Sequence, residues 1–314
     1  GAEAPAEPAG ASVADRRALG YNALARLAGP NLEAFLTLAE QLSIRNFSAP
    51  HIFAADVERG FALIEDLGED DYASVLRRDP SLERDLYEAA VDTLAAIHRS
   101  TFPARPDFKG VSWRIRDYDE AALIVETDLL LDWYAPDVGR TIEDAARDRL
   151  HGHWQRAFRH LSAHAPGLAL RDFHAENLYW LPERADRDGT GQARVGLIDF
   201  QDALFAHPAY DLASLLEDAR RDVDPALVEP LKTRFFERAG LRDRAAFDAA
   251  YAVTAAQRNA KIVGIFVRLA ERDGKKSYRD LIPRVRDHFK RDLSHPACED
   301  LRGWFQTHLP EVLR

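Results

Sequence analysis

The 314-residue sequence has one cysteine, Cys298, and no methionine. A single cysteine excludes an internal disulfide, and a chain without disulfides is typical of a reducing compartment, so we expect a cytoplasmic protein. No apolar run approaches the ~18–20 residues of a membrane-spanning helix, which argues against a membrane protein. The first 20 residues also lack the apolar segment of a secretory signal peptide. Cys298 lies far from the motifs described below, and we assign it no catalytic role.

Positive charge is scarce as well. The net charge is -10 at pH 7, whereas nucleic acids and anionic membranes select basic surfaces. We therefore expect neither nucleic acid nor a membrane as partner, although a local basic pocket for phosphate remains possible. The length allows two lobes with a sizeable core, and a small-molecule substrate is the partner that fits best.

Three oxygen-bearing side chains stand at the ends of short apolar runs in the middle of the chain. Asp172 and Asn177 are five residues apart, and Asp199 follows 22 residues after Asn177. This order and spacing is that of the phosphoryl-transfer core of kinases. There the first Asp accepts the proton of the attacking hydroxyl, while the Asn and the second Asp hold Mg²⁺, a hard cation that takes oxygen ligands. The alternative is that each residue merely turns the chain after a strand.

The surrounding pattern favours the kinase interpretation. Residues 178–181 and 193–198 are apolar, and the stretch between them is a polar loop that contains Asp188-Gly189. These signals predict a β-hairpin. Such a hairpin would bring Asp172, Asn177 and Asp199 to one of its ends.

The rest of the chain predicts an α+β fold. Apolar spacing in residues 16–43 predicts helices interrupted at Gly29-Pro30, with Asn31 as N-cap of the second. Residues 49–55 and 60–64 read as an antiparallel strand pair. Beyond Gly68 we expect helices at 82–99, 118–134, 142–164, 210–222, 225–240, 243–270, 277–291 and 299–308. We expect a small, apparently incomplete α/β N-lobe at 1–66 that binds nucleotide, and a large, mainly helical C-lobe at 67–314 that holds the catalytic hairpin.

Four segments carry a resemblance to a known family. They are 63–68 (Leu-Ile-Glu-Asp-Leu-Gly), 171–178 (Arg-Asp-Phe-His-Ala-Glu-Asn-Leu), 197–203 (Leu-Ile-Asp-Phe-Gln-Asp-Ala) and 207–213 (His-Pro-Ala-Tyr-Asp-Leu-Ala). In this order they resemble the aminoglycoside phosphotransferase family, which has a protein-kinase-like fold and includes choline and sugar kinases. The resemblance covers roughly residues 30–310.

A finer resemblance rests on three further stretches and on the Asp-Phe-Gln-Asp run at 199–202. The stretches are 180–184, 217–223 and 291–296. They look most like bacterial anomeric kinases, which phosphorylate C1 of N-acetylmuramate and N-acetylglucosamine in cell-wall recycling.

The resemblance implies roles for the motif residues. It makes Asp172 the catalytic base, Asn177 and Asp199 the Mg²⁺ ligands, and ATP the phosphate donor. It also places the backbone of Glu65, Asp66 and Leu67 against the adenine edge, where the alternative is a solvated strand end.

Four further residues are expected to support the substrate or the catalytic loop. Asp211 matches a loop-supporting position, or else caps a helix that starts at Leu212. His174 is expected to pack or to bond the backbone rather than to transfer protons. Arg171 would orient the loop or meet phosphate, and Asp202 would accept a hydroxyl or amide N–H of the substrate.

Other candidates for the substrate pocket are less specific. For them we favour core packing or a solvated helix face over a role in binding: Trp113, Glu126, Trp133 and Arg221.

The sequence departs from the family pattern in its first part. A kinase small lobe supplies a Gly-rich loop over the phosphates and a strand lysine that pairs with a helix Glu. Here no such loop precedes residue 60, and the first lysine is Lys109. We expect that a native N-terminal part of the small lobe is missing from the sequence; the alternative is a protein that never had it. Glu33 or Glu40 would be the lysine's partner, unless both are surface positions.

We expect an ATP- and Mg²⁺-dependent kinase that acts on a hydroxyl of a small polar metabolite. An amino sugar is the preferred substrate class. Alternatives within the class are an aminoglycoside kinase, which calls for an acidic pocket, and a choline-like kinase. An alternative outside the class is a weakly active kinase-like binding module, motivated by the missing lysine.

Overall fold

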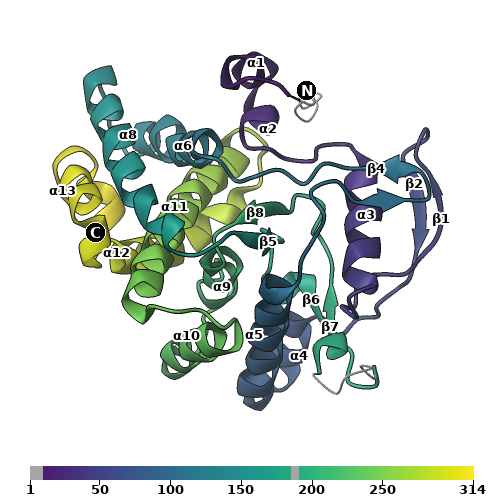
Figure 1. The fold of residues 1–314 in the computed structure, drawn as a ribbon. Coiled ribbons are helices and arrows are strands. Elements are labelled where there is room, and N and C mark those ends of the chain that lie inside the picture. The colour runs from purple at the N-terminus through teal and green to yellow at the C-terminus, as the bar shows by residue number, and fades with distance from the viewer. Residues whose placement is uncertain (1–9, 185–190) are drawn as a thin grey trace. The chain divides into compact units, whose positions relative to one another are not determined.

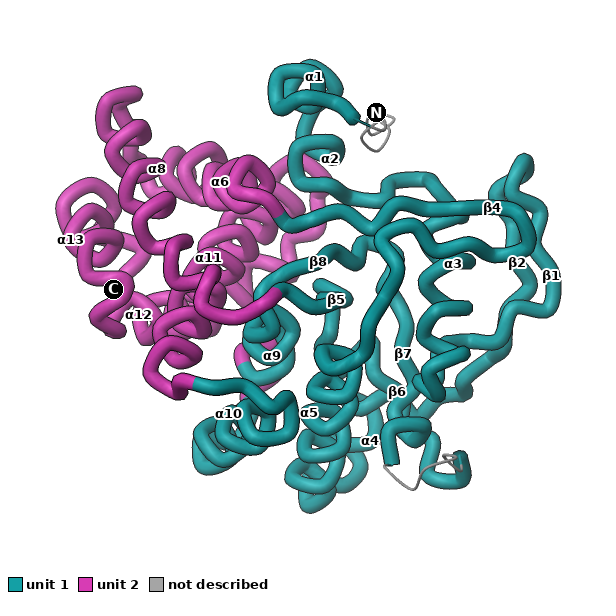
Figure 2. The backbone as a smooth tube through the Cα atoms, viewed as in Figure 1, with its two compact units in different colours: residues 1–118, 166–216, 223–242 teal, residues 119–165, 217–222, 243–314 magenta. Residues whose placement is uncertain are grey.

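The computed structural model describes residues 10–184 and 191–314 (Figure 1). The chain forms two compact units (Figure 2). The first unit consists of residues 1–118, 166–216 and 223–242, and the second of 119–165, 217–222 and 243–314. The lobes expected at 1–66 and 67–314 were defined by what they bind, whereas these units are defined by compactness. The division into two binding lobes therefore stays a prediction.

The first unit opens with helices α1 (Val13–Leu19), α2 (Tyr21–Leu24) and α3 (Leu32–Ser43). The interruption expected around Gly29-Pro30 is present, and Gly29 has a φ of 62°. Asn31 stands at the N-cap of α3, as predicted, although its side chain makes no capping bond there and donates to the Ala28 carbonyl instead.

Strands β1 (Ile52–Asp56) and β2 (Phe61–Ile64) form the expected antiparallel pair, with Asp56 opposite Phe61. Gly60 closes the turn at a φ of 72°, a conformation that costs glycine little. Large apolar side chains of this pair are exposed, among them Phe61 at 70% and Leu63 at 63%. Its ladder hydrogen bonds therefore hold it together more than apolar burial does.

The remaining elements of the first unit include the two strands of the predicted hairpin. They are α4 (Tyr72–Arg78), α5 (Glu83–Arg99), β3 (Asp107–Phe108), β4 (Val111–Ser112), β5 (Gly167–Ala169), β6 (Leu178–Trp180), β7 (Val195–Leu197), β8 (Leu204–Ala206), α9 (Ala209–Leu216) and α10 (Pro225–Arg238). Helices α5, α9 and α10 lie where helices were predicted. Helix α4 and strands β3, β4 and β8 were missed, and strands this short show no readable alternation.

The predicted hairpin is confirmed. Strands β6 and β7 pair antiparallel with Leu178 opposite Leu197, so Asn177 and Asp199 flank the same end of the pair. The loop at Asp188-Gly189 lies outside the described residues. Strand β5 belongs to a separate sheet and pairs with β8, Gly167 opposite Ala206.

The second unit is helical throughout the part that the structure describes. Its helices are α6 (Glu120–Leu129), the π-helix η2 (Leu130–Tyr134), α7 (Ala135–Asp137), α8 (Asp144–Phe158), α11 (Arg244–Glu271), α12 (Ile282–Asp292) and α13 (Glu299–His308), with 3-10 turns at Arg159–Ala163, Lys276–Leu281, Pro296–Cys298 and Pro310–Leu313. Helix α11 approaches α6 closely at Gly264. A Cβ there would stand 2.3 Å from the Leu129 carbonyl, which only glycine avoids.

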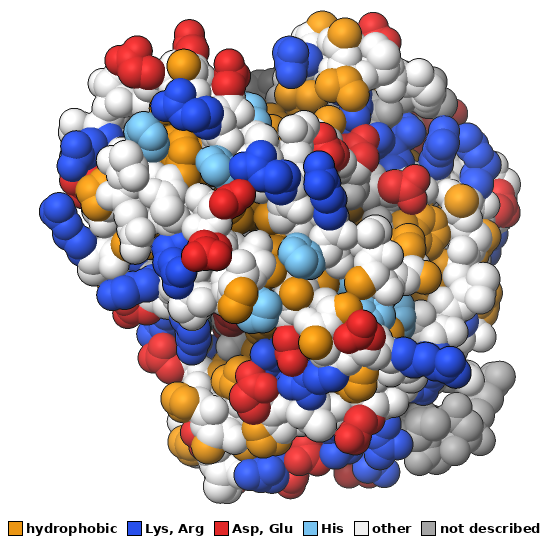
Figure 3. Space-filling model, turned by 60° about the vertical axis from the view of Figure 1, so that its left-hand side comes forward, with side chains coloured by type: hydrophobic (Ala, Val, Ile, Leu, Met, Phe, Trp, Pro, Cys, Tyr) orange, Lys and Arg blue, Asp and Glu red, His pale blue; other side chains and the backbone are white. Residues whose placement is uncertain are grey.

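Two observations concern the expected absence of membrane and nucleic-acid partners, which stays a prediction. Among the residues described, no helix combines the length and the apolar character needed to cross a membrane. On the face drawn in Figure 3, basic and acidic side chains are interspersed rather than gathered into one basic field. This arrangement does not favour general binding of nucleic acid on that face.

A buried acid pair lies in the core of the second unit. The Glu217 and Asp292 carboxylates both accept hydrogen bonds from the Asn259 amide, at 2.7 and 2.8 Å, and the Tyr251 hydroxyl donates to Glu217 at 3.0 Å. Burial, reinforced by the negative charge of Glu217, raises the pKa of Asp292 well above its usual value. The pair therefore holds a proton that the unfolded chain releases. The nearby thiol of Cys298 is also buried, which raises its pKa to about 12 and keeps it neutral.

We expect Asp292→Asn to flatten the pH dependence of stability. An acid whose pKa is raised in the folded state stabilises the fold below its unfolded pKa of ~3.9, and this stability is lost as the pH rises toward the folded value. Asparagine offers Glu217 an N–H in place of the acid proton. Urea unfolding at pH 5 and pH 8 should show a smaller loss of unfolding free energy in the variant; equal losses in the two proteins would contradict the shared proton.

Candidate active site

The backbone that carries Asp172 is held in a strained form. Arg171 has a φ of 75°, which is rare for a residue with a side chain and costs about 1–3 kcal/mol. Asp211, buried in α9, accepts the backbone N–H groups of Leu170 and Arg171 at 2.6 and 2.9 Å. These two bonds are what a loop-supporting residue needs. The alternative N-cap role is wrong, because α9 already begins at Ala209.

The Arg171 side chain turns inward. It is buried, its guanidinium lies over the Tyr118 ring at 5.0 Å, and it donates to the Ala25 carbonyl at 3.1 Å. Of the two expected roles, orienting the loop is the one with contacts in this structure. The contact with phosphate stays a prediction.

The three predicted acceptor residues come together. The Asn177 amide nitrogen donates to the Asp172 carbonyl at 2.9 Å and lies 3.3 Å from an Asp199 carboxylate oxygen. Asp199 also has a left-handed backbone, with a φ of 59°, and accepts the Gln201 amide at 2.6 Å. Strain at both Arg171 and Asp199 fits a functional site, where such conformations concentrate. Gln201 was missed in the sequence because a single Gln carries no spacing signal.

His174 contacts the Asn177 side chain. It is buried, and its Nε2 lies 3.3 Å from the Asn177 amide nitrogen. The position agrees with the expected packing and bonding role, which holds Asn177 in place.

Asp202 makes a hydrogen bond within the protein that the sequence did not predict. Its carboxylate accepts the Ala28 backbone N–H at 2.6 Å. Burial raises the pKa of Asp202, and the charges of Asp172 and Asp199 add to the rise, while Arg171 opposes it. The side chain thus anchors the segment after α2 to the site. Its predicted contact with substrate would use the remaining carboxylate oxygen.

The donor set suits a magnesium ion. The Asn177 amide nitrogen bonds the Asp172 carbonyl and is the atom that faces the exposed Asp199 carboxylate, so Oδ1 remains as the acceptor that this side chain would offer a metal. Within residues 10–184 and 191–314, no group of three or more His, Cys, Asp or Glu side chains is placed to hold a metal. Magnesium commonly takes one or two protein carboxylates and completes its shell with phosphate and water.

The segment expected to face adenine follows β2. The Glu65 side chain forms an ion pair with Arg184, and the Glu65 backbone N–H donates to the His51 carbonyl at 2.8 Å. Asp66 accepts the Gly68 N–H at 2.9 Å, and Leu67 is half-buried. The backbone of these residues is therefore ordered by its own contacts. Its role in nucleotide binding stays a prediction.

A separate pocket brings a lysine near one of the two glutamates that were candidates for the lysine partner of the kinase pattern. Glu40 of α3 and Lys109, between β3 and β4, line the same pocket, together with His51. Glu33 lies on the same helix and is half-buried. Glu40 is thus the glutamate that shares a pocket with a lysine, although this lysine comes from another part of the chain than the family pattern places it.

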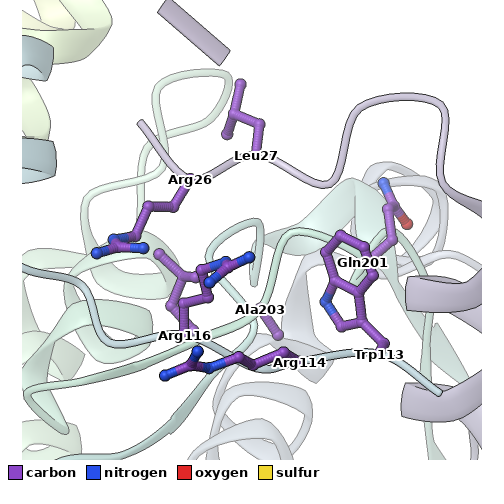
Figure 4. Close-up of a pocket in the computed structure, with 8 residues that line it drawn as sticks. Arg26, Leu27, Trp113, Arg114, Arg116, Gln201 and Ala203 are labelled. Carbon is purple, nitrogen blue, oxygen red and sulfur yellow. The ribbon is translucent and has the colours of Figure 1, made fainter. Parts of the chain in front are cut away.

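The four less specific candidates for the substrate pocket have different surroundings in the structure. Trp113 lines a small pocket with Gln201 and three arginines (Figure 4), so the preference for core packing does not describe it. Glu126 is fully buried in the second unit and pairs with Lys261 at 3.5 Å, which agrees with packing. Trp133 and Arg221 also belong to the second unit and are partly exposed.

Comparisons with known proteins point to one family. A model described as the phosphotransferase enzyme family matches residues 22–248. An N-acetylmuramate/N-acetylglucosamine kinase of Caulobacter vibrioides is 41% identical over 98% of this chain and 83% of its own length. A protein of the same name from Pseudomonas putida is 30% identical over 81% of this chain and 71% of its own length.

The fold agrees with a solved structure. A choline/ethanolamine kinase family protein from Mesorhizobium loti superposes with a TM-score of 0.56 at 15% identity, over 90% of this chain and 86% of the other. At this identity the likeness concerns the fold alone, and the predicted kinase-like α+β fold is confirmed.

Proposed function

This chain belongs to the phosphotransferase enzyme family, and we propose that it transfers the γ-phosphate of ATP to the C1 hydroxyl of an amino sugar, N-acetylmuramate or N-acetylglucosamine. The observation that carries the proposal is the convergence of Asp172, Asn177 and Asp199 in one hydrogen-bonded group. The names of the two relatives support the substrate class. Reactions of this kind serve the recycling of cell-wall sugars, and the need for ATP suits a cytoplasmic enzyme.

Asp172 acts as the base in this proposal. Its loop is fixed by Asp211, so the carboxylate does not have to be ordered during the reaction. It accepts the proton of the sugar hydroxyl as that oxygen attacks the γ-phosphorus. A new O–P bond forms, the bond from the γ-phosphorus to the bridging oxygen breaks, and ADP leaves.

Asn177 and Asp199 would hold Mg²⁺, which supplies positive charge to the phosphate oxygens when bound. Gln201 donates to one Asp199 oxygen and fixes the orientation of that carboxylate. The backbone of Glu65, Asp66 and Leu67 would meet the adenine. These residues would position the phosphates and the adenine of ATP and would take no part in proton transfer.

A comparison of acceptors tests the proposal. We expect phosphorylation of N-acetylglucosamine and N-acetylmuramate and none of their 1-O-methyl glycosides, because the glycosides lack the C1 hydroxyl. ATP consumption and phosphorus NMR of the products provide the measurement. Turnover of a glycoside would move the reaction to another hydroxyl. Turnover of kanamycin or choline alone would replace the amino-sugar assignment, and no turnover with any acceptor would favour a binding module.

A further inference from the structure

A basic pocket adjoins the catalytic group in the first unit. Its lining includes Arg26, Arg114, Arg116, Trp113 and Gln201. Figure 4 shows the three arginine side chains gathered on one side, with Trp113 and Gln201 on the other. Gln201 also donates to Asp199, so the pocket shares a residue with the predicted metal site. In a chain of net charge -10, three arginines around one pocket indicate a site for a negatively charged group.

The backbone fixes the direction of two of these arginines. Residues 113 and 115 donate backbone N–H groups to the carbonyls of Pro106 and Ala104, and residues 116–118 bond to β8, so the stretch 113–118 is extended. The Phe205 N–H donates to the Arg116 carbonyl at 2.8 Å, and the Tyr118 N–H donates to the Phe205 carbonyl at 2.9 Å. Side chains two apart on an extended strand point to the same side. Arg114 and Arg116 therefore share a face, while Ile115, 2% exposed, is buried between them on the other.

The third arginine is placed by the catalytic loop itself. Arg26 has a left-handed backbone, with a φ of 58°. On one side of it, Arg171 donates to the Ala25 carbonyl, and on the other, Asp202 accepts the Ala28 N–H. Two residues of the site thus hold the segment that presents Arg26. The pocket is part of the catalytic architecture rather than a chance arrangement of surface residues.

The chemistry of the pocket selects an anionic oxygen group. A guanidinium has five N–H donors in a planar fork that matches carboxylate and phosphate, so a donor remains for a ligand even where one is engaged within the protein. The pocket volume is about 10 Å³, which is the space of roughly one water-sized group by this measure. It admits an oxygen atom of such a group and not a sugar ring.

We infer that Arg26, Arg114 and Arg116 bind the carboxylate of an acidic amino sugar, such as the lactyl carboxylate of N-acetylmuramate, and so set the preference for acidic over neutral acceptors. This inference rests on the proposed function. A polycationic aminoglycoside would meet repulsion here. The other source of an anionic group is the phosphate of the donor, which the experiment separates from the acceptor.

The test compares N-acetylmuramate with its lactyl carboxamide, which keeps the size of the group but loses the charge. Dissociation constants come from calorimetry on wild type, Arg114→Gln and Arg114→Lys. Arg114 is exposed, so its replacement leaves the core intact. We expect wild type to favour the acid, Arg114→Gln to reduce that preference about tenfold, as for loss of a charge-assisted hydrogen bond, and Arg114→Lys to retain part of it. Arg105→Gln removes an exposed arginine of the same connecting segment that does not line the pocket, and should leave the preference unchanged.

Three outcomes would overturn the assignment. One is an equal preference for the acid in wild type and Arg114→Gln. Another is a loss of MgATP affinity in Arg114→Gln with the sugar preference intact, which would assign the pocket to donor phosphate. The third is a wild type that binds the acid and the carboxamide equally. Absence of phosphorylation with both sugars would reject the proposed function alone, because the binding ratios are measured without turnover.

Discussion

Replacing Asp172 by asparagine should reduce kcat for the sugar by about 10²–10⁴-fold, the contribution typical of a general base. Asparagine keeps the size of the side chain but cannot take the proton of the attacking hydroxyl. The Asp172 backbone carbonyl, which accepts the Asn177 amide, is retained, so the predicted metal site should survive. We expect MgATP affinity to stay close to that of wild type. Steady-state kinetics and calorimetry measure the two effects separately.

The matched control is Asp70→Asn. Asp70 is an exposed acid of the same unit that pairs with Arg78 at the surface, and an exposed pair contributes at most about 1 kcal/mol. This variant should turn over at the wild-type rate. A rate within tenfold of wild type for Asp172→Asn would exclude Asp172 as an essential base.

The hairpin and its three acceptors were predictable from the sequence because they depend on local order. Apolar runs flank Asn177 and Asp199, and strand pairing brings the ends of such runs together whatever surrounds them. The long helices were predictable for the same reason: α5 and α11 repeat their apolar positions over many turns.

The basic pocket was not predictable. Its arginines lie in the segment after α2 and in the extended stretch after β4. They meet because Asp202 and Arg171 hold one segment while β8 holds the other. Contacts between segments so far apart in sequence leave no period or spacing to read. The same holds for Asp211, where the sequence allowed both a cap and a loop support, and only the helix start at Ala209 separates them.

The backbone conformation of two site residues was not predictable from the sequence. Arg171 and Asp199 both have positive φ, which is uncommon for residues other than glycine. Each is held by a partner from elsewhere in the chain: Asp211 for Arg171, and the Asn177 and Gln201 amides for Asp199. The surroundings thus impose conformations that local preference opposes.

Replacing Asp199 by alanine should weaken MgATP binding and abolish most turnover. Magnesium takes few protein ligands, so the loss of one carboxylate removes a large share of what the protein supplies to the ion. Asp199 is exposed and contributes little to the core, although alanine tolerates its left-handed backbone less well than aspartate does. Calorimetry with MgATP on both proteins measures the effect, and thermal unfolding checks the fold.

The control for this variant is Gln201→Ala, which removes the amide that orients Asp199 but no predicted ligand. If Asp199 holds the ion, Gln201→Ala should weaken MgATP binding less than Asp199→Ala, and excess Mg²⁺ should restore much of the loss in the Gln201 variant. A purely structural role for Asp199 would give a different pattern: lowered stability in Asp199→Ala with the metal dependence of ATP binding unchanged. Equal MgATP affinity and equal metal dependence in wild type and Asp199→Ala would exclude Asp199 as a ligand, and with it the two-residue magnesium site.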